Sequence, residues 1–317
     1  MVRTRNVAPT IEGNHRPEED HMLRIAIHRI ATQRRVVTSA ALLLAVTTGS
    51  FAAVGAQAAP AERAHLAATR AASGAAAGAG GASDRPTVVL VHGAFADSSG
   101  WQAVATRLTN AGYPVLAFSN PLRGPTYDSA YLKDFLDTIE GPIVLVGHSY
   151  GGAVITNAAT GDPDVRSLVY VAAYAPDEGE SVAAANTLGG GHTDVTDHLV
   201  VRPFPGASDG DADAYIDPVW FRRLFCQDLP RDTARFMAAS QRPGALAALL
   251  TPSGPPAWED IPSWYLVASQ DRIIPPEAER AMAERADSTT VEIDSSHVAM
   301  MSHPGVVTRL IRQAARG

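Results

Sequence analysis

The feature that most constrains this chain is a serine held between two glycines, directly after an apolar strand and before a helix of small residues. The segment reads Val144-Leu145-Val146-Gly147-His148-Ser149-Tyr150-Gly151-Gly152. A serine in such a strand–turn–helix occupies a strained, tight turn that bulky neighbours would block. The turn lifts the hydroxyl above the edge of a sheet, so Ser149 is predicted to be a nucleophile.

Apolar runs and helical patterns alternate along the chain from residue 87 onward. Strands are expected at residues 87–92, 114–118, 143–147, 167–173, 262–268 and 290–293, and helices at 101–111, 129–139, 151–159, 276–286 and 304–315. This alternation predicts an α/β fold, with a mostly parallel sheet covered by helices on both faces. The alternation stops between about residues 176 and 258, which predicts an inserted lid at the carboxyl end of the sheet.

A serine hydroxyl is a weak nucleophile, so the motif calls for a base and for an acid that orients the base. In a fold of this kind the three follow the chain order serine, acid, histidine. His297 comes after the last expected strand, and Asp271 comes just after the strand that ends near residue 268. We therefore predict Ser149 as nucleophile, His297 as base and Asp271 as the acid.

Other histidines and acids compete for these roles. Asp177 is the alternative acid because it also follows a strand, and His303 is the alternative base. His92 and His148 are interpreted as structural residues, because a packed strand end limits the reach of a side chain. Asp294 lies in or at the end of its expected strand and is interpreted in the same way.

Acyl transfer builds up a negative oxygen that needs two preorganised hydrogen-bond donors. The backbone N–H of Tyr150 is predicted to be one donor, because it follows the nucleophile. The second is predicted to be the N–H of Ala94, in the loop Val91-His92-Gly93-Ala94-Phe95 after the first strand. The side chains expected to contact substrate are Phe95, Tyr174 and Trp220. Their apolar rings favour a small to medium apolar ester as substrate.

With these residues assembled, the chain resembles the α/β-hydrolase superfamily over about residues 86–316. More narrowly, it resembles bacterial esterases related to the plant methylesterase and hydroxynitrile lyase branch. The matching segments are Leu90-Val91-His92-Gly93-Ala94-Phe95, Gly100-Trp101, Gly147-His148-Ser149-Tyr150-Gly151-Gly152 and His297-Val298-Ala299-Met300-Met301-Ser302-His303-Pro304. The resemblance implies hydrolysis of a carboxylic ester without a metal or an organic cofactor. The lyase members carry a lysine directly after the histidine, whereas this chain has Val298.

Three other functions stay open at this point. A cofactor-free lactonase or lyase would use the same three residues. A noncatalytic binding protein would keep the fold without the reaction, although the complete triad argues against that. The third is a noncatalytic surface protein held by an uncleaved N-terminal segment.

The first 85 residues have the pattern of a targeting segment followed by a linker. Arg34 and Arg35 precede an apolar run at residues 36–46 and then small residues up to Ala59. This order predicts a secretory signal region at residues 1–59, with the ordinary and the twin-arginine routes both open, and a secreted bacterial protein. The apolar run is too short to span a membrane. Residues 60–85 are rich in Ala and Gly and predict a flexible linker before a folded domain at 86–317.

Charge and cysteine content exclude several kinds of partner. The net charge is −7 overall and −11 for the residues after 85, so a nucleic-acid partner is not expected. Cys226 is the only cysteine, which excludes an internal disulfide and a cysteine cluster for zinc. The expected partner is a small-molecule ester, with no stable membrane insertion after processing, and the oligomeric state is left open.

Overall fold

The computed structural model describes residues 85–317. The predicted signal region at residues 1–59 lies outside the described residues, as does the predicted linker at 60–85 apart from its last residue. The strands of the described part are β1 (Thr87–Val91), β2 (Val115–Phe118), β3 (Ile143–Ser149), β4 (Val165–Ala173), β5 (Leu199–Arg202), β6 (Asp213–Ile216), β7 (Gly244–Ala245), β8 (Ser263–Ala268) and β9 (Thr289–Ile293). The α-helices are α3 (Gln102–Asn110), α4 (Pro125–Leu136), α5 (Tyr150–Ala158), α6 (Val182–Ala185), α7 (Pro218–Phe225), α8 (Arg231–Ala239), α9 (Leu246–Leu250), α10 (Pro276–Arg285), α11 (Ala299–Ser302) and α12 (Pro304–Ala314). Short 3₁₀ helices lie at η1 (Ser98–Trp101), η2 (Leu188–Gly190), η3 (Val195–His198) and η4 (Ala257–Glu259).

Six strands form the main sheet in the order β2-β1-β3-β4-β8-β9, and every neighbouring pair is parallel. Every residue of the central strand β3 is buried, because helices cover both faces. The edge strand β9 is exposed or half-buried along its length. The central strands therefore read as continuous apolar runs.

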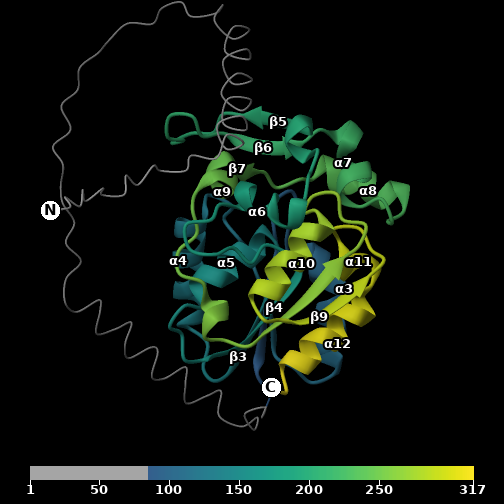
Figure 1. The fold of residues 1–317 in the computed structure, drawn as a ribbon. Helices are drawn as coiled ribbons and strands as arrows, with labels where there is room; N and C mark the ends of the chain where they lie inside the picture. Colours follow the sequence, from purple (N-terminus) through teal and green to yellow (C-terminus); the bar gives the residue numbers. More distant parts are fainter. Residues whose placement is uncertain (1–84) are drawn as a thin grey trace, which may run out of the picture. The chain divides into compact units, whose positions relative to one another are not determined.

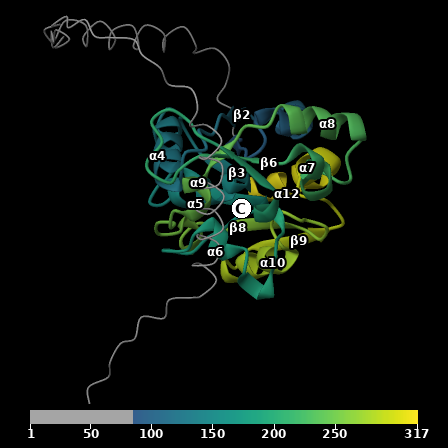
Figure 2. The same ribbon diagram turned by 90° about the horizontal axis from the view of Figure 1, so that it is seen from above.

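Helices cover the two faces of this sheet. On one face α12 packs on β3, β4 and β8 and also on α3. On the other face α5 packs on β1, β3 and β4, with α4 beside it. Figure 2 shows α12 on one side of the sheet and α4 and α5 on the other. The prediction of a parallel sheet with helices on both faces is confirmed.

Between β4 and β8 the chain leaves the main sheet and builds a lid above the carboxyl ends of the strands (Figure 1). The lid contains a three-stranded antiparallel sheet in the order β5-β6-β7. Helices α7 and α8 lie between β6 and β7 in the chain. Helix α7 begins with Pro218 after Asp217, whose side chain accepts the N–H of Val219 at 2.9 Å. The insertion thus lies where α/β sheets place their ligands.

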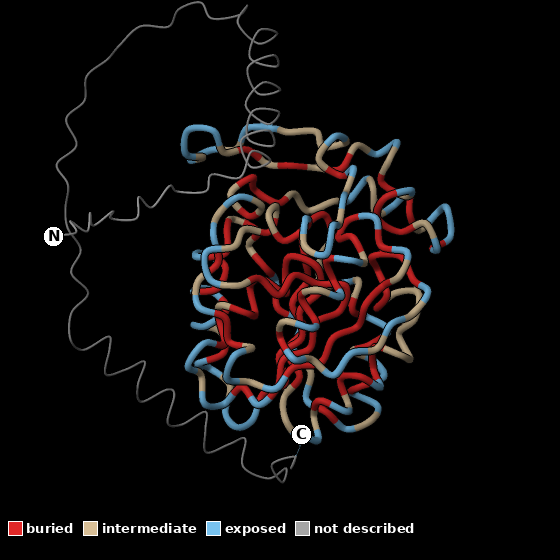
Figure 3. The backbone as a smooth tube through the Cα atoms, viewed as in Figure 1, coloured by how far each residue is buried: buried red, intermediate tan, exposed pale blue. Residues whose placement is uncertain are grey.

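Buried residues gather in the main sheet and on the inner sides of its helices, as the red segments of Figure 3 show. The largest include Trp101, Tyr170 and Tyr265. Cys226 is also fully buried in the lid, and burial raises the pKa of its thiol to about 12. Within residues 85–317, no helix has the length and apolar character needed to span a membrane.

Candidate active site

Ser149 is the last residue of β3 and directly precedes α5. Its backbone has φ 54° and ψ −130°. Residues other than glycine rarely adopt this conformation, which costs about 1–3 kcal/mol. The turn is possible because its neighbours lack side chains: a Cβ on Gly147 would lie 2.7 Å from the Cα of Gly152. The predicted nucleophile therefore occupies the strained strand–helix turn that its motif requires.

The loop after β1 lies directly against this turn. A Cβ on Gly93 would lie 2.5 Å from the Cβ of Ser149 and 3.0 Å from its hydroxyl oxygen. The next residue, Ala94, is buried, and within the described part of the chain its N–H donates to no acceptor. The N–H of Tyr150 stands at the first position of α5, where a helix offers no acceptor of its own. Both predicted oxyanion donors thus belong to segments that meet at Ser149.

Asp271 and His297 form a buried pair. The distance between Oδ2 of Asp271 and Nδ1 of His297 is 2.5 Å, and neither side chain is exposed. The other oxygen of Asp271 accepts the N–H groups of Ile273 at 2.7 Å and Ile274 at 3.1 Å. These donors hold the carboxyl group in a fixed plane. Its bond to Nδ1 fixes the tautomer, so Nε2 of His297 carries the lone pair that a base needs.

Nε2 of His297 is buried and has no hydrogen-bond partner among the described residues. His148, the residue before the nucleophile, brings the histidine loop to the turn. Its Nε2 lies 2.8 Å from the carbonyl oxygen of His297, and the two ring centroids are 4.6 Å apart. The structure therefore brings the three predicted residues to one sheet edge, without a hydrogen bond between Ser149 and His297. Such bonds often tighten only when substrate is bound.

His92 and His148 are both held neutral in structural hydrogen bonds. Burial lowers the pKa of His148 well below its ordinary value, so its Nε2–H donates to the His297 carbonyl. Burial lowers the pKa of His92 to about 4, although its bond to the Gly93 carbonyl acts against this. Because Nε2 of His92 accepts the N–H of Asn120 at 3.0 Å, its Nδ1 carries the proton that Gly93 accepts. These contacts fit the structural interpretation of both residues.

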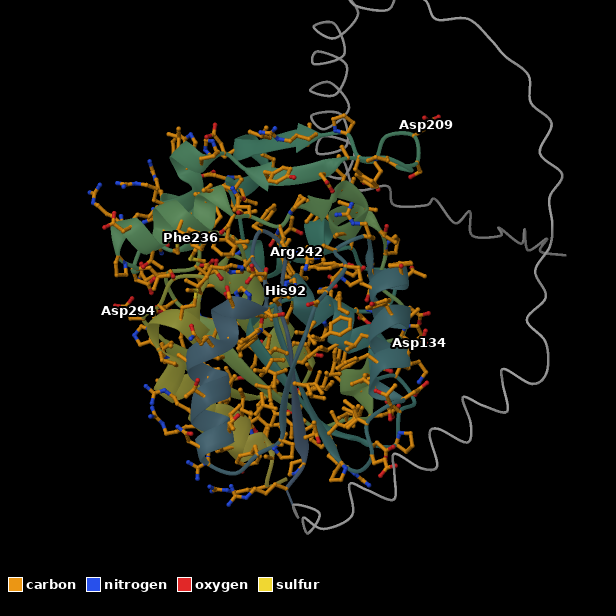
Figure 4. All side chains as sticks on the ribbon, turned by 180° about the vertical axis from the view of Figure 1, so that it is seen from behind. His92, Asp134, Asp209, Phe236, Arg242 and Asp294 are labelled. Carbon is orange, nitrogen blue, oxygen red and sulfur yellow. The ribbon has the colours of Figure 1, made fainter. Side chains whose placement is uncertain are left out.

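The alternative acids and base lie in other contacts. Asp294 is exposed at the periphery, as Figure 4 shows. Asp177 is half-buried and accepts the N–H of Glu178. His303 has its Nδ1 3.0 Å from the hydroxyl of Ser302. None of these side chains has a hydrogen bond to His297 or Ser149 in the described part of the chain.

The predicted substrate-contacting residues lie in different surroundings. Phe95 is buried, has φ 64°, and donates its N–H to the carbonyl of Arg242 in the lid at 2.8 Å. Tyr174 is buried, and its hydroxyl donates to Asn186 at 3.0 Å. Trp220 stacks on His198 with ring centroids 3.8 Å apart. Their roles in substrate binding stay predictions.

The lid supplies two side chains that contact the loop of His297. Phe225, at the end of α7, places its ring 5.0 Å from the His297 ring and 6.5 Å from the rings of His148 and Phe95. Asp228 follows that helix and accepts the N–H of Ser296 at 3.0 Å and its hydroxyl at 2.5 Å. The lid therefore contacts the loop of His297 through the apolar ring of Phe225 and the carboxylate of Asp228.

The aromatic side chain of Tyr150 is buried and contacts Asp128 of α4. Its hydroxyl donates to Oδ2 of Asp128 at 2.7 Å. Asp128 also accepts the backbone N–H groups of Arg123 and Gly124. Arg123 in turn pairs with Asp213 of β6 at 2.8 Å. A polar chain thus connects the first residue of α5 to the lid, a function of Asp128 that no local motif signals.

Figure 4 shows His92 and Arg242 close together where the lid meets the first strand. Within residues 85–317 no group of three or more His, Cys, Asp or Glu side chains is arranged to hold a metal ion.

Comparisons with known proteins agree with the α/β fold. The sequence profile of the alpha/beta hydrolase family matches residues 88–310. The chain is 26% identical over 255 residues to the alpha/beta hydrolase nvfD of Aspergillus novofumigatus, covering 73% of this chain and 97% of that protein. It is 26% identical over 254 residues to Methylesterase 17 of Arabidopsis thaliana, covering 73% and 91%.

A pyrethroid hydrolase from Sphingobium faniae JZ-2 has a similar solved structure, with a TM-score of 0.60 and 23% identity. That match covers 73% of this chain and 98% of that one. This match is a likeness of fold. The chain therefore belongs to the alpha/beta hydrolase family and is a hydrolase of the esterase type.

Proposed function

We propose that this protein hydrolyses a carboxylic ester of a small to medium apolar substrate through a covalent acyl-enzyme. The observation that carries the proposal is the buried Asp271–His297 pair, whose free Nε2 lies at the same sheet edge as the strained Ser149. A hydrogen-bonded acid, a base of fixed tautomer and a serine in a strained turn are the components of a serine hydrolase.

In the first step the hydroxyl of Ser149 attacks the ester carbonyl while Nε2 of His297 takes the hydroxyl proton. Asp271 stabilises the imidazolium that forms. The N–H groups of Ala94 and Tyr150 bind the negative oxygen of the tetrahedral intermediate. His297 then gives its proton to the leaving alcohol, and the ester bond breaks.

In the second step water attacks the acyl-enzyme, and His297 takes a proton from that water. The intermediate collapses, the acid leaves, and Ser149 regains its proton from His297. The ring of Phe225 lies beside His297, and the ring of Phe95 packs against Phe225, which favours an apolar acyl or alcohol group over a charged one. Ser149 itself is only 4% exposed, so substrate entry requires the lid to move.

The test is hydrolysis of a panel of p-nitrophenyl esters of increasing chain length by the wild type and Ser149→Ala. Ser149→Ala is expected to lower kcat on the order of 10⁴-fold or more. A fluorophosphonate should label the wild type at Ser149 and leave the variant unlabelled. Unchanged activity in Ser149→Ala, or a wild type that resists labelling and cleaves no ester, would refute the proposal and favour a noncatalytic protein.

A lactone and a cyanohydrin belong in the same panel. A lactonase would open the ring with the same residues, whereas a cyanohydrin lyase needs a group to stabilise the departing cyanide. Val298, which is fully buried, offers no charge directly after His297. We therefore expect ester cleavage to exceed cyanohydrin cleavage, and equal rates would contradict this.

We also propose that the protein is exported and works outside the cell after residues 1–59 are removed. The sequence pattern of basic, apolar and small residues supports this. The N-terminal sequence of the protein recovered from culture medium tests it, and a mature chain that still begins before residue 36 would contradict it. The acidic folded part supports a small-molecule partner rather than nucleic acid.

A further inference from the structure

A buried carboxyl group behind the Asp271–His297 pair has no part in the mechanism above. Glu279 lies on α10, and it is fully buried. Its Oε2 accepts the N–H of Ala268 at 3.0 Å, at the end of the strand that leads to Asp271. Its Oε1 is buried, and no donor among the described residues forms a hydrogen bond to it. An ionised carboxylate at this position would leave that oxygen unsatisfied.

The neighbouring group is the carboxyl of Asp271, whose negative charge helps to raise the pKa of Glu279. Two carboxyl groups can share a hydrogen bond only when one of them keeps its proton. Asp271 already accepts from two backbone N–H groups and from His297. Glu279 accepts from a single N–H, so the proton belongs on Glu279.

We propose that Glu279 stays protonated at neutral pH, donates through Oε1 to Asp271, and so acts as a positioning residue for the triad. The inference rests on the function proposed above. The neutral acid fixes the plane of the Asp271 carboxylate towards Nδ1 of His297 without adding a second negative charge beside it. Glu279 touches no reacting atom and acts only through Asp271.

The surroundings of Glu279 support the neutral form. Burial raises the pKa of Glu279 well above its ordinary value, and the charge of Asp271 raises it further. Two tyrosines face the carboxyl pair as neutral phenols, since burial raises the pKa of Tyr174 and of Tyr265 above the ordinary range. The nearby cation, Arg280, is 46% exposed and pairs with Glu292 at 2.8 Å. It therefore lies in solvent rather than in the buried space with Glu279.

Infrared spectroscopy of the whole protein tests the protonation state directly. At neutral pH, the spectrum of the wild type minus that of Glu279→Gln should contain the C=O band of a protonated carboxylic acid, which shifts with ¹³C-labelled glutamate. Glu277→Gln, an exposed position on the same helix, is the matched control and should show no such band. A difference spectrum with only carboxylate bands would overturn the proposal, whatever the activity.

Kinetics then tests the positioning role. Glu279→Gln keeps a donor for Asp271 and an acceptor for Ala268, so we expect kcat/KM within about 3-fold of the wild type and an unchanged acid limb of its pH profile. Glu279→Leu removes the donor, and kcat should fall about 10-fold or more at constant KM. A shift of about one unit in the acid limb of Glu279→Gln would show that the wild type carries a charge there and overturn the proposal.

These two arms separate the inference from the proposed function. If no ester is cleaved, the proposed function fails, and the infrared band still decides the state of Glu279. If Glu279→Leu fails to fold, Glu279→Gln and the infrared band remain. An active Glu279→Leu with the wild-type kcat would overturn the positioning role even where the acid band is present.

Discussion

The main sheet and the lid hold the candidate site in different ways. Strands β3 and β4 are buried along nearly their whole length, and they fix Ser149 by continuous packing. The lid has short strands, of which β7 contains two residues, and its side chains Val219 and Phe236 are 84% and 73% exposed. The lid thus leaves large apolar side chains in solvent, whereas every residue of β3 is buried.

The lid reaches the site through the buried ring of Phe225 beside His297 and through polar contacts on the loops that carry the reacting groups. The Arg242 carbonyl binds the N–H of Phe95, Asp228 binds Ser296, and Gln227 donates to the Gln270 carbonyl at 2.6 Å. Local opening needs little free energy where few apolar contacts are lost. The sheet therefore fixes the position of Ser149, whereas the lid covers the site through contacts that can break one at a time.

A matched pair of glycine substitutions tests whether the sheet edge is more rigid than the lid, and we expect the largest effect here. Gly93→Ala places a Cβ 2.5 Å from the Cβ of Ser149, so the nucleophile must shift, and kcat/KM should fall about 100-fold or more. Gly244→Ala in the lid places its Cβ 3.1 Å from the Cβ of Ala94, and a lid can yield by a few tenths of an ångström. We expect a loss below about 10-fold there.

Both variants should be assayed with one ester and their thermal unfolding recorded. Neither glycine has a positive φ, so the backbone tolerates alanine at both positions and the comparison reports on crowding alone. Equal losses at the two positions would mean that the lid is as rigid as the sheet, contrary to the comparison.

Removing the charged contact between the lid and the histidine loop should have the next largest effect. In Asp228→Asn the two donors of Ser296 lose a charged acceptor, so kcat should fall about 10-fold. Asp232→Asn, whose side chain is 93% exposed on the same lid, is the control and should leave kcat unchanged. Steady-state kinetics of both variants measures this.

The same contact gives a pH dependence of stability. Burial acts to raise the pKa of Asp228, but the hydrogen bonds from Ser296 outweigh it and lower the pKa below its ordinary value. A lowered folded pKa means that the contribution is present above the unfolded pKa and is lost as pH falls below about 4. Urea unfolding of wild type and Asp228→Asn should therefore differ more at pH 7 than at pH 3, and a constant difference would contradict the charged contact.

The sequence predicted the sheet well and the lid poorly, for a physical reason. The run at residues 143–147 is apolar because both faces of β3 are covered, and that pattern can be read locally. Helix α4 begins at Pro125, four residues before the predicted start, because the non-helical Gly124 is followed by a proline in the first turn. Its segment 125–128 shows no apolar periodicity that would reveal this.

The strands of the lid sheet cannot be predicted from local sequence in the same way. Strand β7, with two residues, exists only through its pairing with β6, about 30 residues earlier in the chain. The positions of Ser149, Asp271 and His297 follow from motif order and strand ends. Those of Phe225 and Asp228 depend on how α7 docks on the main sheet, and no spacing in the sequence encodes that contact.

Glu279 on helix α10 is fully buried, whereas Asp228 of the lid is exposed. Since the pKa of Glu279 is raised by burial, the folded state binds a proton that the unfolded state has lost above about pH 4.3. Stability from this group is then lost as pH rises, by about 1.4 kcal/mol per pH unit until the folded pKa is reached.

Glu279→Gln removes this proton linkage. Its free energy of unfolding, relative to that of the wild type, should therefore rise between pH 5 and pH 7 in denaturant titrations. Glu277→Gln serves as the exposed control and should show no such trend. A flat difference for Glu279→Gln would mean that Glu279 is ionised in the folded protein.

The ion pair between Arg123 and Asp213 should give the smallest effect. The side chains are 32% and 16% exposed, so a double-mutant cycle of Arg123→Met and Asp213→Asn should give a coupling of about 0.5–1 kcal/mol. The backbone N–H of Arg123, which holds Asp128 beneath Tyr150, survives both substitutions. We therefore expect kcat to change by less than about 3-fold while hydrogen exchange in β6 becomes faster. A coupling well above 2 kcal/mol, or a collapse of kcat, would mean that the lid is a structural part of the nucleophile's turn rather than a cover that opens over it.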